Sequence, residues 1–272
     1  MAISKVIYKS SASATPETWM DATTATAAAA DIISPKTAML ADGVMTTGTG
    51  SVGYTANDWG DRTKPVGEVS CDVAIAYDGN RSKYSSLLQN RTGITKASLP
   101  NATYIPDSYC QGCTGLTSFY APLATATGGN CFYGCNSLEY AVLPSFEWNG
   151  SSSFYYCNNM LAADLGPNAS SMSTYFFRDC AKMATLILRG SSICSLNHTT
   201  VFNNTPFASG KAGGTIYIPE SLYNHLGDNS ASDYKAASNW STIDGYGTIT
   251  WAKIEGSYYE THYADGTTIP TT

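Results

Sequence analysis

Charged residues are scarce in this sequence. Only 13% of the 272 residues are charged, whereas about a quarter are charged in an ordinary globular protein. The net charge is −6, and Lys and Arg form no run anywhere along the chain. Contacts to a phosphate backbone need clustered basic residues, so this composition argues against a nucleic-acid partner.

Long apolar segments are missing as well. The sequence has no stretch of about 18 apolar residues, so we expect no membrane-spanning segment and no insertion into a membrane. Residues 1–19 lack the apolar core of a secretory signal peptide. We therefore expect the protein to be made in a cytoplasm and to stay there, or to leave without a cleaved signal.

Histidine is nearly absent, which limits catalytic and metal-binding chemistry. The three copies, His198, His225 and His262, lie on different parts of the chain, so no catalytic constellation stands out. Cys194 lies shortly before His198, and Cys–His nucleophilic chemistry on a repeat scaffold is a hypothesis that the sequence leaves open. We favour a protein that is not an enzyme and that holds no metal and no cofactor.

Cysteine, by contrast, is frequent, and four of the eight copies form two close pairs. Cys110 and Cys113 stand as C-x-x-C, and Cys131 and Cys135 follow as C-x-x-x-C. Two such pairs separated by a loop are one way in which a chain binds a tetrahedral zinc ion. A disulfide framework and buried, reduced packing residues are the alternative interpretations.

An internal repeat indicates which interpretation to prefer. Cys113, Cys135, Cys157 and Cys180 are spaced by 22, 22 and 23 residues. Three residues after each of them stands Leu or Met, and each copy then continues as L-x-x-L-x-L. The positions of this pattern are Ile94, Ala97 and Leu99; Leu116, Phe119 and Ala121; Leu138, Ala141 and Leu143; Met160, Ala163 and Leu165; and Met183, Leu186 and Leu188.

A short strand that returns at this spacing is typical of a leucine-rich-repeat solenoid. We predict a mainly β fold with five to six coils, whose inward residues are buried only when the next coil stacks on them. The column that holds Cys113 also holds Arg91 and Thr205, which is no arrangement for a zinc site. We therefore interpret the cysteines as buried, reduced packing residues.

The repeats resemble a known class. The segment "CFYGCNSLEYAVLPSF", residues 131–146, is similar to the BspA-like leucine-rich repeats of bacteria. The closing segment is similar to the final coil and cap of that class, with "IYIP" as the last strand and "YKAASNW" as a short helix. The resemblance covers residues 84 to about 250; it implies a fold and says little about function.

The N-terminal part resembles a different group. Its segment "ADGVMTTGTG", residues 41–50, with Thr37 and Ala38 before it, is similar to segments that open many structural proteins of tailed phages and prophages. Asp42 and Gly43 also predict a turn between two extended pieces. Together the two resemblances imply a virion-associated tail or head fibre that presents its repeats for host attachment, and hence a location in the virion.

The predicted organisation has four segments. They are an N-terminal module that attaches to virion proteins and forms an oligomer (1–50), a linker and N-terminal cap (51–83), the solenoid (84–220), and a C-terminal cap with a hairpin tail (221–272). We expect Trp59 and the strand "VAIAY" to cover the first coil. Tyr234 and Trp240 should pack on the last coil.

A ligand site is expected on the outward face of the repeated strands. Solenoids use such faces as extended binding surfaces, and here the face is richer in aromatic and apolar residues than a solvated surface requires. A host glycan or host protein is the expected partner, although neighbouring chains or the N-terminal module could cover the face instead. The residues that we expect to bind are Lys96, Tyr120, Tyr140, Val142, Asp164 and Ile187.

A bacterial cell-surface adhesin built from the same repeats is the alternative function. The lack of a signal peptide disfavours it, because an adhesin must cross a membrane. The genes beside this one would separate the two: capsid and tail genes support the virion protein, and a sortase or secretion system supports the adhesin.

Overall fold

The computed structural model describes residues 75–77 and 84–254, together with the backbone of five strands that come before residue 75. Those five are β1 (Val6–Tyr8), β2 (Thr18–Met20), β3 (Lys36–Met39), β4 (Met45–Thr47) and β5 (Gly67–Ser70). Trp59, Cys71, the predicted turn at residues 42–43 and the predicted hairpin near residue 265 lie outside the described residues. The strands on either side of residues 42–43, β3 and β4, pair antiparallel.

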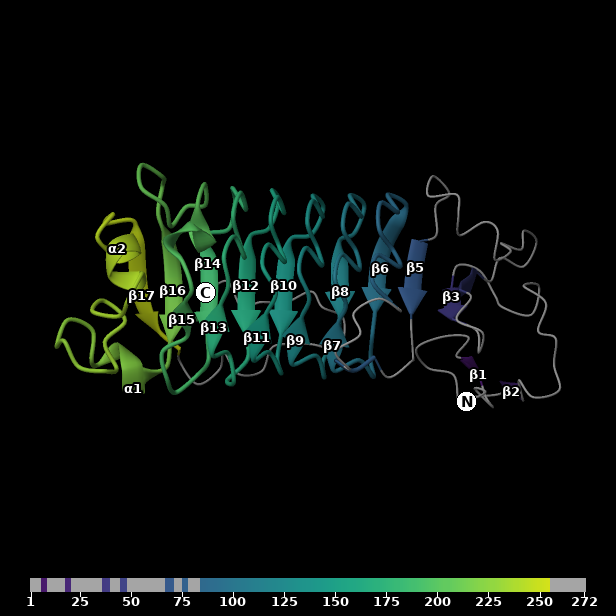
Figure 1. Ribbon diagram of the computed structural model, residues 1–272, viewed down its shortest axis with the longest axis horizontal. Coiled ribbons are helices and arrows are strands. Elements are labelled where there is room, and N and C mark those ends of the chain that lie inside the picture. The colour runs from purple at the N-terminus through teal and green to yellow at the C-terminus, as the bar shows by residue number, and fades with distance from the viewer. Residues whose placement is uncertain are drawn as a thin grey trace.

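The described chain is a stack of coils, and each coil contributes one strand to a main parallel face (Figure 1). These strands are β6 (Ile94–Ser98), β8 (Ser118–Tyr120), β10 (Tyr140–Leu143), β12 (Ala162–Leu165), β14 (Thr185–Leu188) and β16 (Gly214–Ile218). Together with β3, β4, β5 and β17 (Ile249–Lys253), these strands form two five-stranded sheets, ordered β4-β3-β5-β6-β8 and β10-β12-β14-β16-β17. The prediction of a mainly β solenoid is confirmed.

Short strands form a second side of the coils. They are β7 (Tyr104–Ile105), β9 (Ala126–Thr127), β11 (Trp148–Asn149), β13 (Ser171–Met172) and β15 (Ser195–Leu196). The pairs β7–β9, β9–β11 and β13–β15 are parallel. At the N-terminal end of this side, Ile75 is buried and its carbonyl accepts hydrogen bonds from the amides of Thr103 and Tyr104 at 2.9 and 3.1 Å. Part of the predicted "VAIAY" strand therefore does pair with a coil.

Turns stacked on one another form the third side, and their backbone groups also form hydrogen bonds from one coil to the next. The amides of Ser108, Cys110 and Gly112 donate to carbonyls of the next coil at 2.8, 2.8 and 2.7 Å. Five of the turns hold two residues of left-handed backbone, four positions apart in the sequence, and the turn at Asn204 holds one. The first column is Ser86, Ser108, Asn130, Ser152 and Tyr175, and the second is Asn90, Gly112, Gly134, Tyr156, Asp179 and Asn204.

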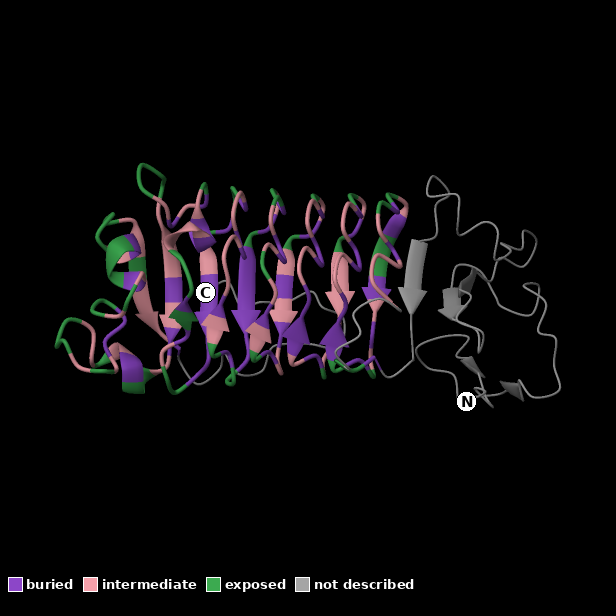
Figure 2. Ribbon diagram, in the orientation of Figure 1, coloured by how far each residue is buried: buried purple, intermediate pink, exposed green. Residues whose placement is uncertain are grey.

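The core is continuous along the stack (Figure 2). The predicted inward positions are buried, except that Phe119 is half-buried and sets its ring edge against Phe132 at 4.5 Å. Phe132, Phe154 and Phe177 form a column of stacked rings, with centroid distances of 5.0 and 5.6 Å between neighbours. One aromatic residue per coil thus fills the space between two coils.

The repeated cysteines do more than fill space. The thiol of each donates a hydrogen bond to a backbone carbonyl in the preceding coil: Cys113 to Leu88 at 2.9 Å, Cys135 to Cys110 at 3.0 Å, Cys157 to Phe132 at 3.1 Å and Cys180 to Phe154 at 3.1 Å. A small apolar side chain with a weak donor suits this position. The seven described cysteines are buried and free, including Cys194, to which the repeat pattern gives no position.

The C-terminal end differs from the prediction in two ways. The "IYIP" strand is not the last, because β17 (Ile249–Lys253) adds a further parallel strand to β16. The helix α2 (Trp240–Asp244) begins at Trp240 and not at Tyr234, since Asn239 has a left-handed φ of 64° that interrupts any helix before it. Two shorter elements, η3 (Thr199–Phe202) and α1 (Glu220–Tyr223), lie nearby.

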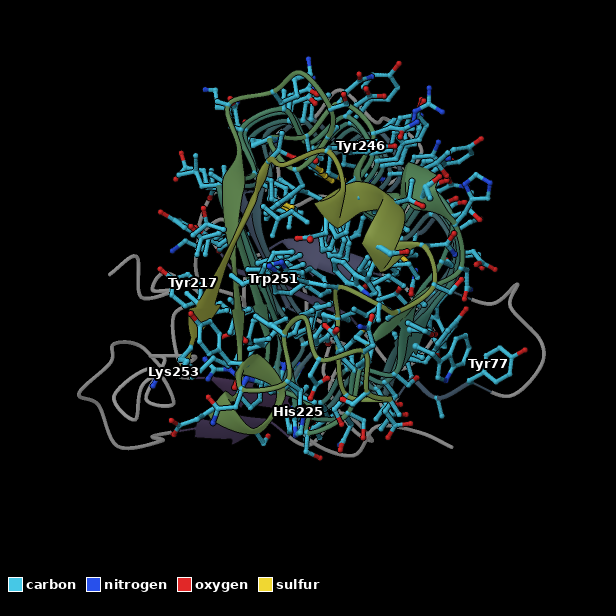
Figure 3. The ribbon with its side chains drawn as sticks, turned by 90° about the vertical axis from the view of Figure 1, so that its left-hand side faces the viewer. Tyr77, Tyr217, His225, Tyr246, Trp251 and Lys253 are labelled. Carbon is cyan, nitrogen blue, oxygen red and sulfur yellow. The ribbon has the colours of Figure 1, made fainter. Side chains whose placement is uncertain are left out.

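Two aromatic side chains fasten this end to the coils. The indole N–H of Trp240 donates to the carbonyl of Cys194 at 2.7 Å, and the amide of Cys194 donates to the hydroxyl of Tyr234 at 2.9 Å. The ring of Trp240 also lies 5.7 Å from that of Phe202. Figure 3 looks along the stack from this end and shows Tyr217 and Tyr77 on opposite sides of it.

We expect Phe154→Ala to lower the free energy of unfolding by about 3–5 kcal/mol, because a buried ring is lost between two coils that cannot close the cavity. Chemical denaturation of the purified protein measures the change. Leu161→Ala is the matched control, since Leu161 is 38% exposed and should cost far less. Equal stability of the Phe154 variant and the parent protein would contradict the coil arrangement.

We also expect the described cysteines to resist thiol reagents until the protein unfolds. Burial raises the pKa of the Cys110, Cys131, Cys135 and Cys157 thiols well above the ordinary value, so little thiolate is present at neutral pH. Reagent uptake is measured against denaturant in a Cys71→Ala background, which leaves only these buried thiols. Full labelling of the native protein, or stoichiometric zinc by elemental analysis, would contradict the packing role.

Candidate functional site

The outward face of the main sheet forms two columns of side chains in register. One column runs through Lys96 and Ser118, and further along through Tyr140, Ala162, Thr185 and Thr215. The other runs through Ser98 and Tyr120, and further along through Val142, Asp164, Ile187 and Tyr217. All six residues that the sequence predicts for ligand binding lie in these two columns.

The six residues differ in exposure. Lys96 is exposed, whereas Tyr120, Tyr140 and Val142 are half-buried. Asp164 and Ile187 are both 0% exposed, although their strand positions face outward. The accessible part of the predicted site is therefore the N-terminal part of the face, on β6, β8 and β10.

An ion pair accounts for Asp164. Arg189, which follows β14, donates from Nε to Oδ1 of Asp164 at 2.8 Å and from Nη2 to Oδ2 at 2.7 Å. Both side chains are buried, at 5% exposure for Arg189 and 0% for Asp164. A bidentate pair of this geometry compensates two buried charges, so Asp164 serves the structure of the face.

A small apolar cluster accounts for Ile187. It contains Ala162, Ile187 and Ile254, with Tyr140, Val142 and Tyr217 packed partly against it. Ile254 directly follows β17, and its amide donates to the carbonyl of Ile218 at 2.9 Å. The outward face thus has a second, smaller core over β12 and β14, and an accessible surface beside it.

Cys194 and His198, the pair considered for nucleophilic chemistry, have other roles in the structure. Cys194 is buried, and burial raises the pKa of its thiol to about 12, so the reactive thiolate is not formed at neutral pH. The ring of His198 is exposed, and its Nδ1 accepts a hydrogen bond from the amide of Thr200 at the start of η3. Among the described residues, no group of three or more His, Cys, Asp or Glu side chains could hold a metal ion.

No helix in the described part of the chain is long and apolar enough to cross a membrane.

A second surface lies on the turn side of the coils and was not predicted. It consists of Tyr133, Tyr155, Tyr156, Tyr175 and Arg178, which we name the tyrosine patch. The patch joins three successive coils through ring contacts, with Tyr133 and Tyr155 at 5.1 Å and Arg178 over Tyr175 at 4.8 Å. The signal in the sequence was a tyrosine directly after Phe132 and Phe154 and two positions before Phe177.

Removing one member of the buried ion pair should destabilise the protein strongly. We expect Arg189→Met to cost about 3–5 kcal/mol, because it leaves the Asp164 carboxylate buried without its guanidinium. The double variant Asp164→Leu/Arg189→Met should recover most of that loss. Denaturation of the single and double variants measures the coupling; simple addition of the two single effects would contradict it.

The exposed pair between Lys253 and Glu220, at 3.2 Å, is the control for this measurement. Both of its side chains are largely in solvent, so Lys253→Met should change the stability by only about 0–1 kcal/mol.

The coils match a known family of repeats. Residues 84–209 match a family model described as the BspA type leucine rich repeat region, in six copies, in agreement with the five to six predicted coils. Among solved structures, the chain is similar to the leucine rich repeat protein TpLRR of T. pallidum, with 18% identity over 47% of this chain and 67% of that chain, and a TM-score of 0.40. No curated protein matches the chain. The six matched copies coincide with the parallel coils, so residues 84–209 are similar in sequence and in architecture to a leucine-rich-repeat region.

Proposed function

We propose that the protein is a structural component of a phage virion that binds a host surface through its solenoid. The observation that carries the binding role is the accessible part of the outward face, where Lys96, Tyr120, Tyr140 and Val142 stand beside one another on β6, β8 and β10. Leucine-rich repeats are binding scaffolds. The family that matches this chain is a repeat family and not a family of enzymes. The partner that we propose is a host glycan or a host protein.

The rigidity of the outward strand face favours binding. Strands of a parallel sheet lie about 4.8 Å apart, so side chains in one column are held at a constant spacing by the backbone. Tyrosine has few rotatable bonds and combines a flat apolar ring with a hydroxyl group, so it gives contact area at a low cost in conformational entropy. A partner that approaches this surface therefore meets side chains that are already ordered.

The attachment role rests on the N-terminal part of the sequence. Residues 1–50 resemble segments of phage structural proteins, and we propose that they bind virion proteins and form a homo-oligomer. The strand β3 pairs in parallel with β5. The strand pairing of the main sheet therefore continues across residue 50, the predicted end of the N-terminal module. Cutting the chain there would expose the edge of β5, which is the kind of edge that pairs with another strand.

A bacterial cell-surface adhesin is the second candidate. The leucine-rich repeats fit it equally well, since the matched family is the BspA type and binding is the proposed role in both cases. The two candidates differ in what the N-terminal residues join: a virion in one case and a cell envelope in the other. The neighbouring genes separate them without any experiment on the protein.

The binding role is tested by changing the accessible face. We expect the triple variant Lys96→Ala/Tyr120→Ala/Tyr140→Ala to reduce adsorption to host cells at least tenfold, because it removes the ordered contact area. Lys211→Ala/Tyr246→Ala, which changes an exposed lysine and an exposed tyrosine elsewhere, is the matched control. Unchanged adsorption by a folded triple variant would remove the strand face from the proposal.

The attachment role is tested with the two parts of the chain in the same assay. A fragment that begins at residue 52 should stay folded and able to bind, yet be absent from purified particles. The matching N-terminal fragment should sediment with the particles. An unfolded residue-52 fragment, or one that still joins particles, would contradict the boundary or the anchoring role.

A further inference from the structure

The tyrosine patch is a compact aromatic surface on the turn side of the coils. The rings of Tyr155 and Tyr156 stack at 4.4 Å with an interplanar angle of 11°, and the ring of Tyr133 stands edge-on to both, at 5.1 and 5.7 Å. Tyr175 lies 6.0 Å from Tyr155. The guanidinium of Arg178 lies over both of these last two rings, at 4.8 and 5.3 Å. The side chains thus hold each other in place.

The backbone beneath the patch is unusual. Tyr156 has a φ of 61° and Tyr175 a φ of 62°. The equivalent position to Tyr156 is Asn, Gly, Gly, Asp and Asn in the other coils, and the equivalent position to Tyr175 is Ser, Ser, Asn and Ser. Asn, Asp and Gly tolerate a left-handed backbone, whereas a bulky aromatic residue adopts it only at an energetic cost. Both aromatic residues at these positions fall within the patch.

The left-handed backbone is what makes the stack of Tyr155 and Tyr156. Consecutive side chains of an extended chain point to opposite faces, so two neighbouring rings do not normally stack. The turn at Tyr156 brings both rings to the same side of the coil. Tyr156 is 41% exposed, so burial does not offset the unfavourable backbone. The repeat requires the left-handed backbone but not an aromatic side chain on it, and an unfavourable residue of this kind is typical of a ligand site.

The chemistry of the patch narrows the ligand. It offers flat ring faces, together with tyrosine hydroxyls that can donate and accept hydrogen bonds. The pKa of Tyr155 is raised, by partial desolvation first and also by its hydrogen bond with Tyr156, so its hydroxyl keeps its proton at neutral pH. The charge of Arg178 is balanced by Asp179, whose Oδ2 lies 3.5 Å from the Arg178 Nε. The surface is therefore aromatic and close to neutral.

There is also room beside the rings. Gly134, next to Tyr133, has a φ of 74°, and a Cβ at this position would meet only the Cα of Gly112, at 4.0 Å. Two neighbouring coils thus carry no side chain in the column in which Tyr156 projects. At Gly112 the Asn90 side chain occupies the place of a Cβ, so the open space lies over Gly134, in the coil next to Tyr156, where a flat ligand can lie.

We propose that the tyrosine patch is a binding site for a neutral glycan. The C–H face of a pyranose ring is apolar and flat and its edge carries hydroxyl groups, which matches stacked tyrosine rings with hydroxyls at their rim. A neutral sugar also avoids the unfavourable approach of an acidic ligand to a chain with a net charge of −6. This site lies on a different side of the coils from the outward strand face and goes beyond the proposed function.

The test uses the full chain and a printed array of oligosaccharides. The array carries neutral glycans of glucose, galactose, mannose and N-acetylglucosamine, together with sialylated counterparts of the same core structures. We expect binding to a subset of the neutral glycans and no gain from sialylation. Absence of binding to every neutral glycan, or binding only to the sialylated ones, would overturn the proposal.

Variants then assign the binding to the patch. Tyr156→Gly should weaken binding to the neutral glycan identified on the array at least tenfold, and should raise the melting temperature, because glycine relieves the left-handed backbone. Tyr155→Ala should weaken binding by a similar factor. Tyr246→Ala, which changes an exposed tyrosine outside both surfaces, is the control and should leave glycan affinity unchanged.

The outcomes separate this site from the proposed function. Glycan binding that survives Tyr156→Gly but is lost with Tyr120→Ala would place the sugar on the strand face and overturn the patch. Loss of glycan binding with unchanged host adsorption would support the patch as a site of its own. Retention of full glycan affinity by both patch variants would overturn the assignment.

Discussion

Hydrogen bonds from one coil to the next are the interaction on which the rest of this structure depends. They run along all three sides: the main sheet, the row of short strands, and the turns, where alternate amides such as those of Ser108 and Cys110 donate to the following coil. A single coil has no partner for these groups and cannot bury its inward residues. The coils are therefore stable only as a stack, and a change in one coil acts through its neighbours.

This dependence explains the composition of the interior. The thiols of Cys113, Cys135 and Cys157 each donate to a carbonyl of the preceding coil, so the repeated cysteine adds a weak bond between coils as well as filling space. Stacked phenylalanines fill the adjacent column. The low charge content follows from the same geometry, because most positions of a coil contact another coil and a buried charge needs a partner such as the one that Asp164 has in Arg189.

Binding surfaces can arise where the repeat does not dictate the side chain. The outward columns on β6, β8 and β10, and the tyrosine patch on the turns, are such places, and they lie on different sides of the coils. On the turns, every coil has a left-handed backbone at the position that Tyr156 occupies, although this conformation is unfavourable for a tyrosine. A side chain that departs from what the coil requires is the more informative one, because packing does not account for it.

The sequence by itself determined the coil length, the inward positions and the register of the outward columns, because each of these follows from a periodicity that every coil repeats. Only the tertiary structure decided which outward positions are accessible. Asp164 and Ile187 face outward by their strand positions, yet Arg189 and Ile254, which come from other coils, bury them. The same holds for β17 and for the stacked rings of Tyr155 and Tyr156: pairing beyond the last repeat and a left-handed turn depend on contacts between distant segments, which a local pattern does not encode.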